Sequence, residues 1–447
     1  MLKYKYGNCF KSVDACVLAS KLSENDGLSL VIAPSISELT RLHRELEFYL
    51  DGTGVDLLLF PDWETLPYDQ FSPHKEIISE RLSTLYQITQ VSTGVVLASA
   101  QTLMHQLCPQ EYILSRVFKL KVGDRLNLKK IRSRLVDINY NQVSQVEIQG
   151  EYAIRGSIID IYPMGAEIPY RIDLFDDEVD GIRTFDIEDQ RTVDSIENIN
   201  LLPAREFPFD KSSISKFRTN WRDCFQSDPR LSPLYLQVSE AQMAAGLEYY
   251  LGLFFDKLHT IFDYLPKATT IYSIGDIQNS VNEFWQSITT RNERFGHDLT
   301  RPILDKNEVY IEPQSFMQEL KDFPQVMLVE SEVENGTTRS NIEFTKVPDI
   351  KMDIKKTSET GARLNTFLQS SDNRILFCAE SIGRHQILEQ ILRNHGVAPQ
   401  NISSWKEFIN SESQYNVCVA PLVNGYVSCK QGFSIVTEFE LFVRQYH

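Results

Sequence analysis

Residues 152–193 read YAIRGSIIDIYPMGAEIPYRIDLFDDEVDGIRTFDIEDQRTV, and this stretch decides the fold. Apolar and polar residues alternate along it, as they do in a strand that buries only one face. Turn signals interrupt the alternation at Pro163 to Gly165 and at Asp176-Asp177. Short alternating runs separated by tight turns predict an antiparallel meander. We therefore expect a β domain in this part of the chain, beginning near residue 119.

The residues before the β domain predict strands that alternate with helices. Apolar runs suited to buried strands cover residues 28–33, 55–60 and 94–99, and helical patterns cover residues 39–48 and 77–91. Ser35 or Ser37 would cap the first helix. Apolar strands that alternate with helices predict a parallel sheet covered on both faces.

After Leu202-Pro203 the pattern becomes helical and aromatic again, and an apolar segment at 270–274 could rejoin the first sheet. Residues 331–361 are polar and charged, which is typical of a linker. Beyond them, apolar runs at 374–379 and 415–421 flank a helix that ends near Gly396. These features predict a small separate α/β domain.

The predicted fold class is α/β, with a split parallel-sheet domain, an inserted antiparallel β domain and a small separate α/β domain. The predicted divisions are 1–118 for the first part of the split domain, 119–205 for the inserted β domain, 206–330 for the second part, 331–361 for the linker and 362–447 for the small domain.

The net charge, the cysteine pattern and the lack of long apolar runs restrict the possible functions of the chain. The formal net charge of −16 gives no global attraction to DNA phosphates, so a protein partner is the better expectation. Seven cysteines are scattered without a C-x-x-C pair, which is typical of reduced residues in a reducing compartment. The first residues lack the architecture of a signal peptide, and no apolar run has the length of a membrane span. We therefore expect a cytoplasmic protein without membrane contact.

The chain lacks the phosphate-binding loop of a nucleotide hydrolase, G-x-x-x-x-G-K-[ST], whose backbone amides and lysine hold the phosphates. No glycine in it directly precedes a lysine, and the nearest approach is Gly7 to Ser12 (GNCFKS), with Phe10 in place of a glycine. We therefore expect no catalytic residue for ATP hydrolysis and no bound cofactor.

Other catalytic or metal-binding patterns also fail. Asp176 to Gly181 begins like a calcium-binding loop, but Ile187 stands where the closing glutamate should be. His385 and His395 are too far apart to ligate one metal from adjacent helical turns. No metal site is predicted.

The alternation of side chains along residues 170–175 and the next strand predicts a sheet face with charged and aromatic residues. In Tyr170–Phe175, Arg171, Asp173 and Phe175 share one face, opposite the aliphatic residues. The next strand places Arg183 and Phe185 on one face in the same way. Arginine and aromatic side chains on a polar sheet are typical of the centre of a protein interface. An alternative is that Phe175 is a core residue beneath a linker or a neighbouring domain.

The charge of this region disfavours DNA as its partner. Residues 169–197 contain ten acidic and three basic side chains, and such a surface repels a phosphate backbone.

Four sequence segments closely resemble the bacterial transcription-repair coupling factor family, Mfd. They are 60–69 (FPDWETLPYD), 72–82 (SPHKEIISERL), 150–156 (GEYAIRG) and 169–177 (PYRIDLFDD). The resemblance covers nearly all of the chain, and it implies a degenerate helicase-like module similar to the excision-repair protein UvrB, whose inserted β domain contacts UvrA.

Carried over by motif, the resemblance implies that the arginine of Y-x-x-R-G is Arg155 and that the R-[VIL]-[DE]-[LF]-F strand supplies Arg171, Asp173 and Phe175. With Arg183 on the next strand, these residues form the expected UvrA-binding site. Arg171 and Arg155 are expected to be charged anchors and Phe175 an apolar plug. Asp173 is expected either to orient the arginines or to pair across the interface. The expected function is that of an adaptor that recruits nucleotide excision repair.

The chain also departs from its relatives. The segment between Trp63 and Ser72 is too short for the long aromatic hairpin with which UvrB grips DNA. Family members continue into a polymerase-docking domain and a translocase driven by ATP and magnesium. This chain is therefore expected to be a fragment, with RNA polymerase and DNA bound by the other domains.

Two other functions remain open from the sequence. A local basic groove on the α/β part could bind nucleic acid. Alternatively, the chain could be a clamp that regulates the translocase through an intramolecular contact.

Overall fold

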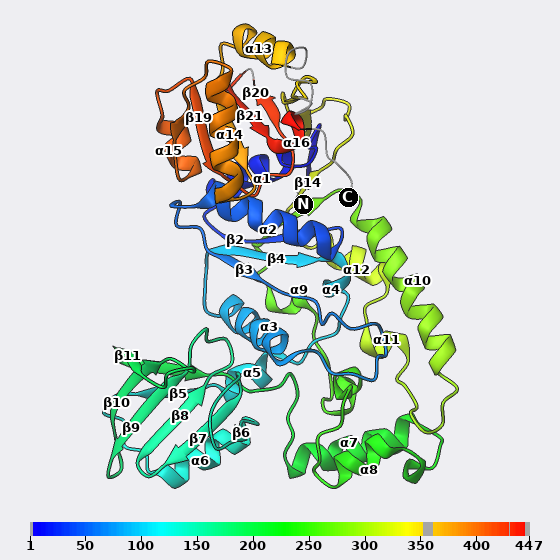
Figure 1. Cartoon of the computed structure of the whole chain (residues 1–447). Helices are drawn as coiled ribbons and strands as arrows, with labels where there is room; N and C mark the ends of the chain where they lie inside the picture. The colour runs from blue at the N-terminus through cyan, green and yellow to red at the C-terminus, as the bar shows by residue number, and fades with distance from the viewer. Residues whose placement is uncertain (1–2, 352–360, 429, 443–447) are drawn as a thin grey trace.

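A computed structural model describes residues 3–351, 361–428 and 430–442 of the chain. Figure 1 shows a central sheet with helices above and below it, a β domain at one lower corner and a small domain at the top. Among the described helices, none is both long and apolar enough to cross a membrane.

The central sheet has seven strands in the order β15-β1-β14-β13-β2-β4-β3, and every pairing in it is parallel. These strands are β1 (Lys3–Gly7), β2 (Leu28–Ala33), β3 (Leu57–Leu59), β4 (Gly94–Ser99), β13 (Thr270–Ile274), β14 (Gln325–Leu328) and β15 (Arg339–Asn341). Because β13 pairs with β2, the chain rejoins its first sheet after the β domain, which confirms the prediction of a split α/β fold.

Helices cover both faces of this sheet because its inner strands are apolar on both sides. In β2, Leu30 and Ile32 belong to one core, and Val31 and Ala33 belong to the other. On one side lie α1 (Val13–Ser23) and α2 (Ile36–Leu50); on the other lie α3 (Lys75–Ile88), α4 (Ala100–Leu103) and α9 (Ile261–Tyr264). The remaining helices of this part are α5 (Gln110–Arg116), α7 (Lys211–Cys224), η1 (Pro229–Leu231), α8 (Pro233–Ser239), η2 (Leu247–Leu253), α10 (Ile277–Phe295), α11 (Lys306–Val309) and α12 (Pro313–Leu320).

The β domain contains a six-stranded sheet in the order β11-β10-β9-β8-β7-β6, antiparallel from β7 to β11. The predicted meander is therefore confirmed. Its strands are β6 (Asn141–Gln142), β7 (Glu151–Arg155), β8 (Ile158–Tyr162), β9 (Tyr170–Phe175), β10 (Glu178–Phe185) and β11 (Thr192–Ile196); beside them lie α6 (Leu128–Asp137) and the pair β5 (Phe118–Lys121) and β12 (Asn198–Leu201).

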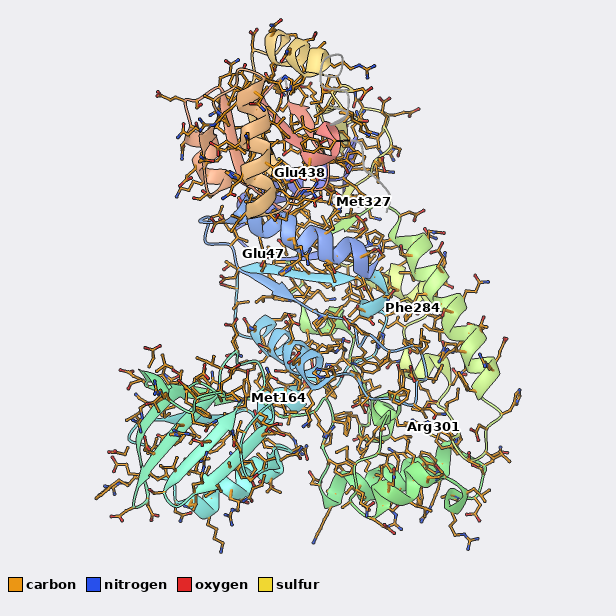
Figure 2. The ribbon with its side chains drawn as sticks, in the orientation of Figure 1. Glu47, Met164, Phe284, Arg301, Met327 and Glu438 are labelled. Atoms are coloured by element: carbon orange, nitrogen blue, oxygen red, sulfur yellow. The ribbon has the colours of Figure 1, made fainter. Side chains whose placement is uncertain are left out.

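The β domain rests on the central domain through α3. Met164 lies where the two parts meet (Figure 2), and the amide of the neighbouring Gly165 donates a 2.7 Å hydrogen bond to Ser79 Oγ of α3. Gly165 has a φ of 80°, and a Cβ at this position would collide with Ser83. The turn predicted at Pro163 to Gly165 is thus also a docking contact.

The small domain has a six-stranded sheet in the order β16-β20-β21-β17-β19-β18. Its elements are β16 (Thr345–Lys346), α13 (Gly361–Ser370), β17 (Arg374–Ala379), α14 (Ile382–Asn394), β18 (Gln400–Asn401), α15 (Trp405–Asn410), β19 (Tyr415–Val419), β20 (Tyr426–Ser428), β21 (Phe433–Thr437) and α16 (Glu438–Leu441).

Residues 331–361, predicted as a linker, contribute a strand to each of two sheets. In the described part of this segment, β15 pairs with the edge strand β1, and β16 pairs with β20. Both strands are mostly exposed, so backbone pairing at sheet edges places them there rather than a hydrophobic pattern. Residues 352–360 of the predicted linker lie outside the described residues.

The small domain shares a hydrophobic core with the central domain. Leu42 and Leu46 of α2 belong to the same buried cluster as Phe408 and Phe433 of the small domain. The hydroxyl groups of Tyr49 and Tyr426, both buried, lie 2.7 Å apart. The small domain is therefore packed firmly against α2.

Candidate partner-binding surface

Strand register places the charged side chains of the β domain side by side. Asp160 of β8 pairs with Arg171 of β9, and Arg171 pairs with Arg183 of β10. The adjacent positions Ile159, Ile172 and Ile182 are also in register, and all three are buried. One face of the sheet is therefore apolar core and the other is charged, as the alternation predicts.

Asp160 connects two arginines on the charged face. Its Oδ1 accepts a 2.6 Å hydrogen bond from Arg171 Nε, and its Oδ2 accepts from Arg171 Nη2 at 3.0 Å and from Arg155 Nη2 at 2.5 Å. The Asp160 side chain is 1% exposed, whereas that of Arg155 is 52% exposed. A buried carboxylate thus orients a half-exposed arginine.

Arg171 is a mostly covered member of this face. Its side chain is 16% exposed, its Nη1 donates to the backbone oxygen of Gln190 at 3.1 Å, and its guanidinium stacks 4.7 Å from the centre of the Phe185 ring. The hydrogen bond to Asp160 raises the pKa of Arg171. Arg171 therefore orders the surface from within, with few donors left for a partner.

A second ion pair lies beside the first. Arg183 Nη2 is 2.5 Å from Asp173 Oδ2, and the side chains are 42% and 23% exposed. Arg183 thus presents a fixed and accessible cation next to the Asp160 pairs.

Phe175 lies at the end of β9, and it is 72% exposed. The next residue, Asp176, has a φ of 51° and begins the turn into β10. The alternative that Phe175 is a core residue is therefore wrong in this structure.

Phe185 lies on the same face as Arg171 and Arg183, as the alternation predicts, but it is not exposed. The register between β10 and β11 shifts between Arg183 and Phe185, and Phe185 is 1% exposed beneath the guanidinium of Arg171. The guanidinium of Arg171 covers this ring, so sharing a strand face does not by itself predict exposure.

Sequence reasoning also missed Asp160, the residue that joins Arg155 to Arg171. A signal was present in Ile158–Tyr162 (IIDIY), because a carboxylate between two buried isoleucines must face the opposite side of the strand.

The loop between β1 and α1, where a phosphate-binding loop would lie, is filled by the chain itself. A Cβ on Gly7 would collide with the Asn341 side chain. Ser12 Oγ donates to Glu45 Oε1 at 2.7 Å and accepts from the Asn424 amide at 3.1 Å. Gly7 and Ser12 of this loop are therefore both engaged by other parts of the chain.

Within the described ranges, no group of three or more His, Cys, Asp and Glu side chains is arranged to hold a metal ion.

Comparison with known proteins gives two family matches. Residues 118–207 match the UvrB interaction domain, and residues 367–441 match the MFD D3 domain. The first match contains the charged face and Phe175.

Similar curated proteins are the transcription-repair-coupling factors of several bacteria. That of Escherichia coli is 36% identical over 96% of this chain and 37% of its own length. That of Haemophilus influenzae is 36% identical over 94% of this chain and 36% of its own length. That of Bacillus subtilis is 25% identical over 92% of this chain and 36% of its own length. The chain thus spans a little over a third of the length of these relatives.

Proposed function

This chain belongs with the transcription-repair coupling factors, to which 96% of it aligns, and on that premise we propose that it is an adaptor that recruits UvrA. The β domain would make the contact, because the match to the UvrB interaction domain covers its strands β5 to β12.

The observation that carries this proposal is Phe175, an exposed aromatic side chain beside fixed charges. Phe175 is 72% exposed at the end of β9, and the Arg183–Asp173 pair lies on the same sheet face. Aromatic and arginine side chains contribute most of the binding energy in many interfaces, provided that they are well ordered. The ion pairs supply that order.

Within the proposed site, the five residues have different roles. Phe175 inserts into a pocket on UvrA, and Arg155 and Arg183 present accessible charge. Asp173 holds Arg183, and Arg171 holds the surface together through Asp160. Arg171 is therefore a positioning residue rather than the anchor that the sequence suggests.

A protein partner fits this surface better than DNA. Ten acidic and three basic residues lie between 169 and 197, and such a charge balance repels phosphates. The filled loop between β1 and α1 supports an adaptor without a nucleotide. Binding of RNA polymerase, DNA, ATP and magnesium would then belong to other parts of the longer factors.

We expect Phe175→Ala to weaken UvrA binding about thirtyfold, or about 2 kcal/mol, because it removes the apolar centre of the site. Its thermal stability should not change, since the side chain is largely in water. Isothermal titration calorimetry with purified UvrA measures the first quantity, and a thermal melt measures the second.

Phe71→Ala is the matched control, because Phe71 is also 72% exposed but lies outside the β domain. It should bind UvrA as the parent chain does. Equal affinities for the parent and for Phe175→Ala would show that Phe175 is not part of the UvrA site.

A further inference from the structure

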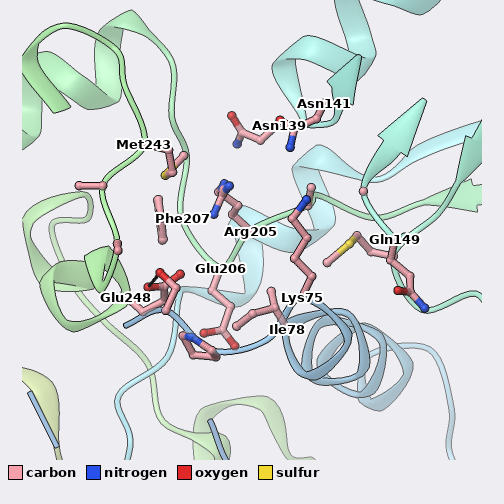
Figure 3. A pocket seen from close by; sticks show the side chains of 17 residues that line it. Lys75, Ile78, Asn139, Asn141, Gln149, Arg205, Glu206, Phe207, Met243 and Glu248 are labelled. Atoms are coloured by element: carbon pink, nitrogen blue, oxygen red, sulfur yellow. Dashed lines mark hydrogen bonds between the residues drawn. The ribbon is translucent and has the colours of Figure 1, made fainter. Parts of the chain in front are cut away.

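A cavity of about 300 Å³ lies where three parts of the chain meet (Figure 3). Its wall includes the start of α3, the β domain, the connector that leaves the β domain, and the segment before and within η2. Its lining residues include Lys75, Ile78, Asn139, Asn141, Arg205 and Phe207.

Two cations line this cavity without a fixed counter-ion. Among the described residues, neither Lys75 Nζ nor the Arg205 guanidinium has a hydrogen bond or an ion pair. By contrast, the buried Arg41 and Arg81 are each held by carboxylates. An unpaired cation in a partly buried site is costly, and an anion would relieve that cost.

Lys75 and Arg205 line the same cavity, and their like charges disfavour each other. Burial lowers the pKa of Lys75, and the charge of Arg205 lowers it further although Glu151 opposes this. Burial also lowers the pKa of Arg205, and Glu248 only partly offsets this. A dianion between these side chains would favour both charges.

The carboxylates of the cavity are already engaged. Glu206 accepts hydrogen bonds from Arg81 Nε at 2.7 Å and from Trp63 Nε1 at 3.2 Å, and Glu248 accepts from Ser72 Oγ at 2.7 Å. Burial raises the pKa of Glu248, which favours its neutral form. Figure 3 shows Lys75 and Arg205 extending toward Asn139 and Asn141, on the other side of the cavity from Glu206 and Glu248.

Asn139 and the start of α3 also belong to the wall of the cavity. The Nδ2 atom of Asn139 is buried and has no hydrogen-bond partner among the described residues. The helix α3 begins at Lys75, and its N-cap, His74, provides no side-chain hydrogen bond, so the amides of the first turn remain available. A helix of 14 residues also presents a partial positive charge at this end.

Apart from Ser72 and Gln149, the rest of the wall is apolar. Ile78, Phe207 and Met243 line the cavity, and the cavity is far too small for a nucleic-acid duplex. Its chemistry suits a phosphate group on a compact apolar body. Arginine and lysine together with helix amides favour the two negative charges of a phosphate over the single charge of a carboxylate.

We propose that this cavity binds a small phosphate-bearing molecule, with the phosphate between Lys75 and Arg205. Lys75 belongs to the central domain, Asn139 and Asn141 to the β domain, and Arg205 to the connector between them. The ligand would therefore link the β domain to α3. This site does not depend on UvrA binding, and it lies apart from Phe175.

The test uses the whole chain and two probes with the same ring, phenyl phosphate and benzoate, in phosphate-free buffer. Calorimetry should detect saturable binding of one phenyl phosphate per chain, with benzoate at least tenfold weaker. Lys75→Met and Arg205→Gln should each weaken phenyl phosphate binding about tenfold or more, because each removes a charge-assisted hydrogen bond. Lys119→Met, on the exposed side of β5, is the matched control and should bind as the parent does.

Three results would each overturn the proposal. They are the absence of saturable phenyl phosphate binding to the parent chain, equal binding of benzoate, and unchanged binding by Lys75→Met. If Arg205→Gln fails to fold, the result for Lys75→Met alone tests the proposal. The Lys75 side chain lies in the first turn of α3 and pairs with no other group of the described chain, so its replacement should not impair folding. Binding of UvrA by the same variants is measured separately. It distinguishes a wrong assignment of the phosphate site from a wrong assignment of the adaptor function.

Discussion

Asp160 is a single carboxylate on which the order of the charged face depends. It is 1% exposed, and it accepts hydrogen bonds from two arginines on different strands. A buried carboxylate in such a position is stabilised only while both cations stay in place. The surface around Phe175 is consequently rigid because of a residue that a partner cannot touch.

We expect Asp160→Ala to lower the free energy of unfolding by about 3 kcal/mol, because it leaves the mostly buried Arg171 without its partner. Urea denaturation at pH 7.5 measures this quantity. Binding of UvrA by the folded fraction should weaken as well, since Arg155 loses its fixed position.

Asp189→Ala provides the comparison for this variant. Asp189 forms a 3.8 Å pair with Arg191, and both side chains are more than half exposed. An exposed pair of this kind contributes little, so the change should stay within about 0.5 kcal/mol. A similar loss for both variants would contradict the role given to Asp160.

The sequence predicts which residues share a strand face better than it predicts the burial of each side chain. Alternation alone places Arg171, Asp173 and Phe175 on one face, and the structure has them there. The low exposure of Arg171 could not be predicted, because it depends on Asp160 and Phe185, which belong to two other strands. Contacts between strands are set by register, which a single strand pattern does not contain.

At the level of elements, the structure shows which of two serines caps the helix α2, a choice that the sequence leaves open. Ser35 has an extended backbone and accepts a 3.3 Å hydrogen bond from the Glu38 amide. Ser37 lies inside the helix, and its hydroxyl is 3.0 Å from that of Ser35. Ser35 is therefore the N-cap of a helix that packs against both the central sheet and the small domain.

We expect Ser35→Ala to lower the free energy of unfolding by about 1 kcal/mol, because the first turn of α2 loses its cap. Ser37→Ala should change it by less than about 0.5 kcal/mol, since this side chain caps nothing. Chemical denaturation of the two variants side by side measures both. The reverse order would mean that Ser37 is the effective cap in solution.

The elements also differ in how well the sequence predicts them. The strand expected at 94–99 is β4 with the same bounds, since an apolar run between turn signals has few other conformations. By contrast, β15 and β16 lie in a segment expected to be a linker. Their exposed polar residues carry no hydrophobic signal, and only pairing with β1 and β20 makes them strands.

Across the whole molecule, many thiols and phenols are buried as neutral groups. Burial, with a smaller contribution from the charge of Glu206, raises the pKa of Cys108 from 9.0 to about 12. Burial, with the charge of Asp14, likewise raises the pKa of Cys9 to about 12. Each group stays protonated in the folded chain at a pH where the unfolded chain has lost its proton.

The consequence is a loss of stability in alkali. Between pH 9 and 12 the unfolded chain binds fewer protons than the folded chain, so the free energy of unfolding falls as the pH rises. Cys108 alone should contribute a loss of about 2 kcal/mol between pH 9 and pH 10.5. Urea denaturation at pH 7.5, 9 and 10.5 measures the decline.

Cys108→Ala isolates the contribution of this thiol. The variant should be less stable than the parent at pH 7.5, because Cys108 is buried in the core and its loss leaves a small void. Its further decline up to pH 10.5 should be shallower than that of the parent. Parallel declines for the two proteins would show that the thiol of Cys108 does not remain neutral in the folded state.

The core shared by the central and small domains also couples the movements of the two domains. Tyr49 touches Tyr426 across the boundary, and the amides of Val423 and Asn424 donate to Glu45 and Ser12. A force applied to the small domain would be transmitted directly to the central domain through this packed boundary. The two domains would therefore turn together as one body, and the β domain, which docks on α3, would turn with them.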